Sequence, residues 1–266
     1  MRRYFRLLLA LGRYSLLREL AFRTNFLAKI SVEVLWLGVL ILFYKTIFSK
    51  TPSVADWSET EFLFFLGCYY ALEGMIETLF LENASEFAEL VRTGDLDFFL
   101  LKPIDEQFLI SCRNIDWSTA ANVVMGFVLM GIALVQMNWV FDPVRLVLFL
   151  LMFVCGLGLA YSFLLLLTST SVWFMRNQSL YELWWLFTSL MRYPREIFEN
   201  SWAFLLGRFF TLVIPVLIVV NVPASIMVKA FDGPTLAGMF GATLVMLCIS
   251  RRVFQAALRR YRSASS

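Results

Sequence analysis

Long apolar segments recur along this chain and are separated by short polar stretches. A helix needs about 20 apolar residues to cross a hydrocarbon core that is about 30 Å thick. Six segments come close to that length or exceed it. They cover residues 26–48, 61–81, 114–137, 144–170, 179–193 and 235–252. The pattern therefore predicts an all-α integral membrane protein with six transmembrane helices.

The N-terminal segment, residues 1–24, mixes basic and apolar residues at roughly helical spacing. Arginines interleaved with Leu and Phe in this way are typical of a helix that lies along an anionic membrane surface. We therefore expect an amphipathic interfacial helix, and the alternative is a helix that docks on protein instead of lipid. The arginines and the lack of a small-residue cleavage site argue against a cleavable signal peptide.

The region 196–234 holds an apolar helix, 203–222, that is interrupted by Pro215 and closed near Pro223. Basic residues decide how to place it, because cytoplasmic loops carry an excess of Lys and Arg. With six spans and both termini in the cytoplasm, 16 of the 23 lysines and arginines lie inside. A seventh span would put the arginine-rich tail outside. We therefore predict that 203–222 is a re-entrant or interfacial helix on the outer side.

The longest polar stretch inside the chain, residues 82–108, lies between the second and third predicted spans, on the cytoplasmic side. Charged residues in it recur at intervals of three and four, which places them on one helical face. They are Glu82, Glu86, Glu89 and Arg92. We expect Gly94 to end this helix and Lys102-Pro103 to end the apolar run that follows. A short amphipathic helix held between two spans is a suitable docking element for a soluble partner.

Two carboxylates, Glu73 and Glu77, lie within the second predicted span and share a helix face because they are four residues apart. Ionisable groups at this depth are costly and usually face protein or a water-filled cavity. One interpretation is that they line a substrate path. The other is that they make polar contacts between helices, with a base such as Lys29 or Arg113 or with a partner subunit.

Composition agrees with a membrane protein and removes several kinds of chemistry. Apolar residues make up 60% of the chain, charged residues make up 16%, and the mean hydropathy is +0.73. The chain has no histidine, which excludes histidine metal sites and histidine-dependent hydrolysis. Its four cysteines lack a CxxC spacing, so we interpret them as small buried hydrophobes. The net charge of +3 is too small to favour nucleic acid as a partner.

The sequence contains no nucleophile elbow, metal-ligand cluster or phosphate-binding loop. We therefore predict no catalytic residue and no metal site, and the chain is not expected to be an enzyme. No linker rich in Gly or Ser and no internal repeat divides it, so residues 1–266 are expected to form one transmembrane permease domain.

Two groups of residues resemble a known family of membrane transporters. The first is Arg92-Thr93-Gly94-Asp95-Leu96-Asp97, followed by Leu100-Leu101-Lys102-Pro103-Ile104. The second comprises Tyr193-Pro194, Ile197-Phe198, Ile214-Pro215 and Asn221-Val222-Pro223. Together with the order of the predicted spans, they resemble the permease subunits of bacterial type-2 ATP-binding-cassette (ABC) exporters. The similar subgroup is usually encoded as two related permeases with one ATPase.

By this resemblance, the first group lies near the coupling helix that contacts the ATPase subunit. The residues that the resemblance assigns to coupling are Glu89, Arg92, Gly94, Asp95 and Leu96. Glu86 is added to them because it lies on the same helical face as Glu89. Nothing in the chain matches GxxxxGK[ST], so ATP hydrolysis is expected in another subunit. This chain is therefore expected to bind no cofactor, while ATP and Mg bind the partner ATPase.

The resemblance also implies partners and a location. The expected partners are a cytoplasmic ABC ATPase, a second permease that is either related or identical, and membrane lipid. The expected location is the bacterial plasma (inner) membrane, with both termini cytoplasmic. In this reading the chain forms half of a translocation path that an ATPase drives, in the direction of export.

Two other classes of function remain open at this point. A secondary transporter or channel would use Glu73 and Glu77 as ion or proton sites and would need no ATPase, but the inverted repeats typical of that class are not visible. A lipid-modifying membrane enzyme would need a polar catalytic cluster, and the lack of histidine counts against it.

Overall fold

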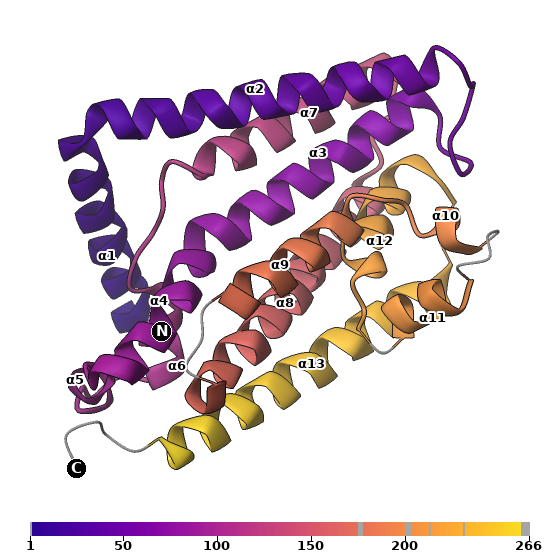
Figure 1. Ribbon diagram of the computed structural model, residues 1–266. Coiled ribbons are helices and arrows are strands. Elements are labelled where there is room, and N and C mark those ends of the chain that lie inside the picture. The colour runs from indigo at the N-terminus through magenta and orange to yellow at the C-terminus, as the bar shows by residue number, and fades with distance from the viewer. Residues whose placement is uncertain (1, 175–177, 200–203, 213, 231, 262–266) are drawn as a thin grey trace.

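The computed structural model describes residues 2–174, 178–199, 204–212, 214–230 and 232–261 (Figure 1). Within these residues every regular element is a helix, and an isolated β-bridge joins Val54 to Trp57. The predicted all-α class is therefore confirmed. Parts of the region 196–234, namely 200–203, 213 and 231, lie outside the described residues.

The first half of the chain forms α1 (Arg2–Ala21), α2 (Arg23–Phe48), α3 (Glu59–Ile76), η1 (Glu77–Leu81), α4 (Glu82–Thr93), α5 (Leu96–Leu100) and α6 (Glu106–Cys112). The second half forms α7 (Ala120–Gln136), α8 (Pro143–Phe174), α9 (Gln178–Met191), α10 (Glu196–Glu199), α11 (Phe204–Leu212), α12 (Leu217–Val228) and α13 (Gly233–Arg260).

Four helical segments in the described residues are long and apolar enough to span a membrane. They are α2, the continuous helix Glu59–Thr93, Pro143–Trp173 within α8, and α13. α7 has 17 residues and α9 has 14, so at 1.5 Å per residue they are about 25 and 21 Å long. Each of the six predicted spans thus corresponds to a helix, and the number that crosses the bilayer completely stays a prediction.

The helix of the second predicted span continues without a break into the amphipathic helix predicted after it. The span was expected to end at residue 81, and α3, η1 and α4 form one uninterrupted helix from Glu59 to Thr93. Ser58 and Glu61 begin it with a capping box, in which Glu61 accepts from the Ser58 backbone N–H at 2.8 Å. Past residue 81, three polar side chains of α4 bond to other parts of the chain, namely Glu82, Asn83 and Glu86.

Close contact between backbones holds α3 against α7. A Cβ atom added to Gly67 would lie 2.8 Å from the Gly126 carbonyl, and one added to Gly126 would lie 2.5 Å from Ala71 N. Small residues that allow such approach are typical of helix pairs in membranes. α8 packs in turn along α12 and α13, and α12 also contacts α3, so α3 and α8 form the centre of the bundle.

The outer-side region breaks at Pro215, as predicted, but Pro223 does not close it. α11 precedes the break and α12 continues through Pro223 to Val228. Pro223 lacks the N–H that would bond the Val219 carbonyl four residues earlier. That carbonyl lies 2.6 Å from where a Cβ of Gly156 would be, so α8 passes closely over the gap. Packing against α8 therefore compensates for the proline inside the helix.

α1 turns sharply away from α2 and presents two different faces (Figure 1). One face docks on protein, because Gly12 and Ser15 are buried against the segment that follows α6. The other face exposes large apolar side chains, among them Phe5, Leu9 and Leu17. Docking on protein therefore describes one face of the N-terminal helix. The other face has the apolar character expected of a helix on a membrane surface, and its contact with lipid stays a prediction.

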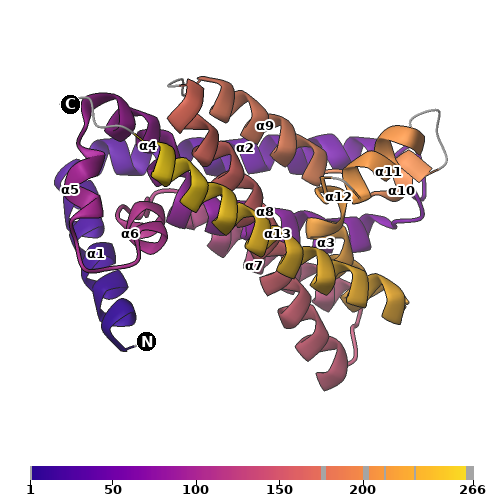
Figure 2. The ribbon, with the colours of Figure 1, turned by 90° about the horizontal axis from the view of Figure 1, so that it is seen from below.

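The two ends of the bundle carry different elements. α1 and α4–α6 lie at one end together with both chain termini, while α10, α11 and the loop after α2 lie at the other (Figures 1 and 2). The start of α1 and the end of α13 therefore lie at the same end of the bundle, and the side of the membrane that this end faces stays a prediction.

Candidate functional site

The α4–α5 tip, which we define as residues 93–102, follows the long helix that begins at Glu59. α4 ends where Gly94 adopts a φ of 83°, in the left-handed region that glycine enters at little cost. The Thr93 hydroxyl donates to Asp95 Oδ2 at 2.8 Å and stabilises the turn. The predicted helix end at Gly94 is confirmed, and the tip is a short separate helix, α5, attached to a long rigid one.

Two large apolar side chains project from the α4–α5 tip. Phe98 is 67% exposed and Leu101 is 82% exposed. Beside them Arg92 Nε donates to Glu89 Oε2 at 2.9 Å, in an ion pair exposed enough that it contributes little to stability. Apolar side chains within a charged rim are typical of a contact site for another protein.

Leu96 and Glu86, which the sequence assigns to the same site, make contacts within the chain, although the Glu86 side chain is partly exposed. Leu96 has no exposed surface and belongs to a small core with Phe87, Val91 and Ile110. Glu86 accepts hydrogen bonds from Arg113 and from Asn114 Nδ2. Both residues therefore fix the tip to the bundle. The predicted coupling residues that the structure brings together at or beside the surface are Glu89, Arg92, Gly94 and Asp95.

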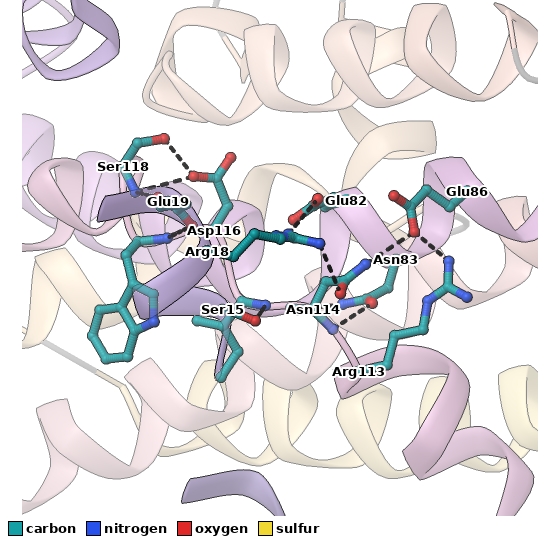
Figure 3. Close-up of polar contacts among 12 residues, drawn as sticks. Ser15, Arg18, Glu19, Glu82, Asn83, Glu86, Arg113, Asn114, Asp116 and Ser118 are labelled. Atoms are coloured by element: carbon teal, nitrogen blue, oxygen red, sulfur yellow. Dashed lines mark hydrogen bonds and ion pairs between the residues drawn. The ribbon is translucent and has the colours of Figure 1, made fainter. Parts of the chain in front are cut away.

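A buried asparagine connects α4 to the segment between α6 and α7. The Asn83 amide donates to the carbonyls of Leu79, Ser111 and Asn114, at 3.1, 3.0 and 2.7 Å. Its Oδ1 accepts from Asn114 N at 2.9 Å (Figure 3). The Asn83 side chain is 1% exposed, so these bonds replace water that it cannot reach.

One turn of π-helix, η1, comes directly before the helical turn that carries this asparagine. A π turn leaves backbone groups without their usual partner, and such turns are frequent at functional sites. Here the Thr78 carbonyl accepts from Asp116 N at 2.9 Å, and the hydroxyls of Thr78 and Thr119 are 3.1 Å apart. The altered turn therefore binds the start of α7.

α1 joins the same cluster through a carboxylate. Glu19 accepts from the backbone N–H groups of Trp117 and Ser118, at 2.8 and 3.0 Å (Figure 3). Burial raises the pKa of Glu19, and the two hydrogen bonds offset part of that rise. Arg18 donates to Glu82 Oε1 at 3.1 Å. We call the set Ser15, Arg18, Glu19, Glu82, Asn83, Asn114 and Asp116 the α1–α4 junction.

The C-terminal end of α13 is tied to the α6 side of the tip. Arg251 donates to Asp105 Oδ2 at 2.8 Å and to Gln107 Oε1 at 3.1 Å. Burial raises the pKa of Asp105, but the bonds from Arg251 and from Phe108 N outweigh it, so the pKa lies below its ordinary value. The tip, α1 and α13 thus form one connected end of the bundle.

A groove of about 540 Å³ opens on the side of the bundle, between α2, α3, α7 and α9. We call it the α2–α9 groove. Its polar lining comes from Glu33, Glu73, Glu77, Asn122 and Arg192, and its aromatic lining from Trp36, Tyr70 and Trp185. The two carboxylates singled out in the sequence therefore both face an open space.

The bases that could have neutralised these carboxylates are bonded elsewhere. Lys29 pairs with Asp116 at 3.4 Å, and Arg113 pairs with Glu86. Around Glu77 the polar neighbour is Asn122, whose Nδ2 lies 3.4 Å from Glu77 Oε2 and 3.1 Å from Glu33 Oε2.

Glu73 has a different neighbour, Arg192. The guanidinium of Arg192 donates to the Tyr69 hydroxyl at 3.1 Å and attracts Glu73 electrostatically. One interpretation made from the sequence was that these carboxylates pair with a base such as Lys29 or Arg113. Neither of those two pairs forms.

Several residues of these sites were missed in the sequence. Asn122 is a polar residue in the otherwise apolar helix α7, which is the signal that could have identified it, whereas Asn83 lies among the charged residues of α4 and gave no such signal. Arg192 was counted as an outer-side base, although its side chain reaches the groove. Phe98 and Leu101 were noted within an apolar run, but periodicity alone did not separate them from buried Leu96.

Comparison with known proteins adds one finding. A family model described as an ABC-2 family transporter protein matches residues 34–265. The match begins within α2 and includes the α4–α5 tip, α13 and the lining of the α2–α9 groove except Val32 and Glu33. Searches of curated proteins and of solved structures gave no match.

Proposed function

This chain belongs to the ABC-2 family of transporter proteins, and from that premise we propose that it forms half of an ATP-driven export path. Membership makes it the multi-pass membrane component of an ABC transporter. The proposal adds the direction of transport, a cytoplasmic ATPase bound at the α4–α5 tip, and a second permease. It places the chain in the bacterial inner membrane with both termini in the cytoplasm.

The exposed tip carries this proposal. Phe98 and Leu101 are apolar, exposed and held on the end of a helix that runs from Glu59 to Thr93. An apolar pair of this kind in a charged rim fits a shallow protein groove. The tip, the termini and the arginines of α13 share one end of the bundle, which supports a cytoplasmic position for the tip.

The ATPase supplies the chemistry that this chain lacks. Its nucleotide site would bind ATP and Mg²⁺, while this chain contributes no nucleotide-binding loop. Closure of the ATPase would move the tip, and the movement would bias the membrane helices between two arrangements. Glu89, Arg92, Gly94 and Asp95 would lie in or beside the contact.

The surface of α2 supports a second permease. Only Leu37 and Leu40 are buried in this 26-residue helix. The exposed side of α2 continues into the α2–α9 groove, where α9 also exposes Trp185. A second permease, either identical or the related partner typical of the subgroup, would cover this face and close the groove into a path.

Copurification tests the proposal. The chain is expressed with the ABC ATPase encoded beside it, and a Phe98→Cys variant is treated with a short thiol cross-linker. We expect the ATPase to copurify and to cross-link to position 98. The unsubstituted chain, which keeps its own four cysteines, is the control. A tip that is labelled from outside intact cells would contradict the proposal.

A transport assay with the purified chain distinguishes the alternative function from the proposed one. A secondary transporter or channel that used Glu73 and Glu77 would move its cargo without an ATPase. Transport by the purified chain alone, in vesicles that contain no ATPase, would support that alternative.

A further inference from the structure

The α2–α9 groove is lined by more acidic than basic side chains. Three carboxylates line it, from Glu33, Glu73 and Glu77, against the single guanidinium of Arg192. The nearby Lys29 and Asp116 neutralise each other at 3.4 Å. No ion pair to the three carboxylates is found among the residues that the structure describes.

An unused acceptor lies beside these carboxylates. Asn122 is 4% exposed and lines the groove, and its Nδ2 is directed at Glu33 and Glu77. Its Oδ1 is buried and has no hydrogen-bond partner. Buried acceptors are normally satisfied, so the carbonyl calls for a donor that the folded chain does not supply. A ligand with N–H groups would satisfy Asn122 and the carboxylates together.

The rest of the lining is aromatic and apolar. Trp36 is 55% exposed and Trp185 is 70% exposed, so both indole rings are open to a ligand. A volume of about 540 Å³ is within the range of pockets for drug-sized molecules, about 300–1,000 Å³. Aromatic faces also attract cations. A bare metal ion fits less well, because the described residues contain no group of three metal-ligating side chains.

We propose that the α2–α9 groove binds an amphipathic organic cation, with its ammonium group at Glu33, Glu77 and Asn122 and its flat apolar body against Trp36 and Trp185. The proposal rests on the transport function proposed above and adds the substrate class. The ammonium donates hydrogen bonds to the carboxylates and to Asn122 Oδ1. The positive charge of Arg192, which also lines the groove, repels the bound ammonium and weakens its binding.

Binding of a matched pair of fluorescent probes tests this. The permease and its ATPase are reconstituted in lipid nanodiscs and titrated with dansylcadaverine, which is a primary ammonium, or with its neutral N-acetyl derivative. We expect the cationic probe to bind at least tenfold more tightly. We expect Glu77→Gln and Glu33→Gln each to weaken its binding by about tenfold and to leave the neutral probe unchanged.

Two further variants separate charge from general disruption. Glu182→Gln changes an exposed carboxylate on α9, outside the groove, and should leave binding unchanged. Arg192→Gln removes the opposing charge and should tighten binding of the cationic probe by several-fold. Equal affinity for both probes, or the same result for Glu77→Gln as for Glu182→Gln, would overturn the inference.

The outcomes also distinguish this inference from the function on which it rests. If the ATPase copurifies and hydrolyses ATP but binding ignores the charge of the probe, the substrate class is wrong and the transport function stands. If the ATPase does not associate with the chain at all, the proposed function itself fails. Thermal unfolding of each variant, measured in the same nanodiscs, identifies any variant that is merely misfolded.

Discussion

The side chain of Asn83 binds the backbone of Asn114 at both of its polar groups. Asn83 Nδ2 donates to the Asn114 carbonyl at 2.7 Å, and Asn83 Oδ1 accepts from Asn114 N at 2.9 Å. One side chain thus takes the place of a secondary-structure partner for the segment between α6 and α7. The α1–α4 junction depends on this arrangement, because Arg18 and Glu86 also bond to the Asn114 side chain.

Replacing Asn83 by Ala should destabilise the protein strongly. The substitution leaves a buried N–H and several buried carbonyls without partners, which costs about 2–4 kcal/mol of unfolding free energy. Thermal unfolding in nanodiscs measures the loss. Asn114→Ala is the matched control, since it keeps the backbone groups that Asn83 binds, and its effect should be at most half as large. Equal effects would contradict this account, because the side chain of Asn114 would then contribute as much as the bonds that Asn83 makes.

Charged substitutions at the α4–α5 tip should abolish ATPase association without unfolding the chain. Phe98→Asp and Leu101→Asp place a carboxylate on exposed positions, so the unfolding temperature should change little. Copurified ATPase should fall at least tenfold, because an apolar contact is lost and a charge is buried. Val140→Asp, at an 83% exposed position between α7 and α8, is the control and should retain the ATPase.

Gly94 should be sensitive to any side chain that resists its conformation. Its φ of 83° costs a residue such as Ala about 1–2 kcal/mol. We expect Gly94→Ala to shift the turn and to lower transport per ATP hydrolysed, while membrane insertion stays intact. Gly94→Asn should be milder, because Asn tolerates the left-handed region better. If both variants couple normally, the tip does not transmit motion.

The contact between α3 and α7 should not accept a larger residue at Gly126. A Cβ there would lie 2.5 Å from Ala71 N, so Gly126→Val must separate the two backbones. We expect a loss of about 2–4 kcal/mol in unfolding free energy. Gly131→Val on the same helix has open space around it and should have a small effect in the same unfolding assay.

The ion pair between Asp105 and Arg251 should make stability depend on pH in the acid range. The pKa of Asp105 is lower in the folded chain than its ordinary 3.8, so the folded state binds this proton less tightly than the unfolded state does. The stabilisation is therefore complete above the ordinary pKa and is lost as pH falls through the lower, folded one. Asp105→Asn should be less stable than the unsubstituted chain at pH 6, and the difference should shrink below about pH 4. A constant difference would contradict this account.

Helix positions were largely predictable because lipid and protein both select apolar runs of a given length. α2 and α8 follow their predicted ranges closely, and Gly94 ends α4 as expected. The pattern did not show that the second predicted span and the amphipathic helix after it form one continuous helix. Glu82 and Glu86 are polar, but they bond to α1 and to the segment after α6, and the helix continues through them. Sequence periodicity does not reveal such partners.

The candidate site was predictable in outline only. Spacing placed Glu73 and Glu77 on one face, and the structure places that face on a groove. Arg192 and Asn122 join them from α9 and α7, and only the packing of those helices brings them near. At the tip, residues in one short run differ completely in exposure: Leu96 is buried and Phe98 is open. That difference arises from where α5 rests on its small core.

The π turn η1 changes the angle between the carboxylates on either side of it. Glu77 and Glu82 are five residues apart, and in a regular α-helix this spacing would turn them about 140° away from each other. With the wider turn between them, both remain close enough to Asp116 to be repelled by it. In the function proposed above, the helix would act as a lever, because about 25 Å of unbroken backbone joins Glu77 to Gly94. Deleting one residue from η1 would rotate the far arm about 100° and misdirect the motion of that lever.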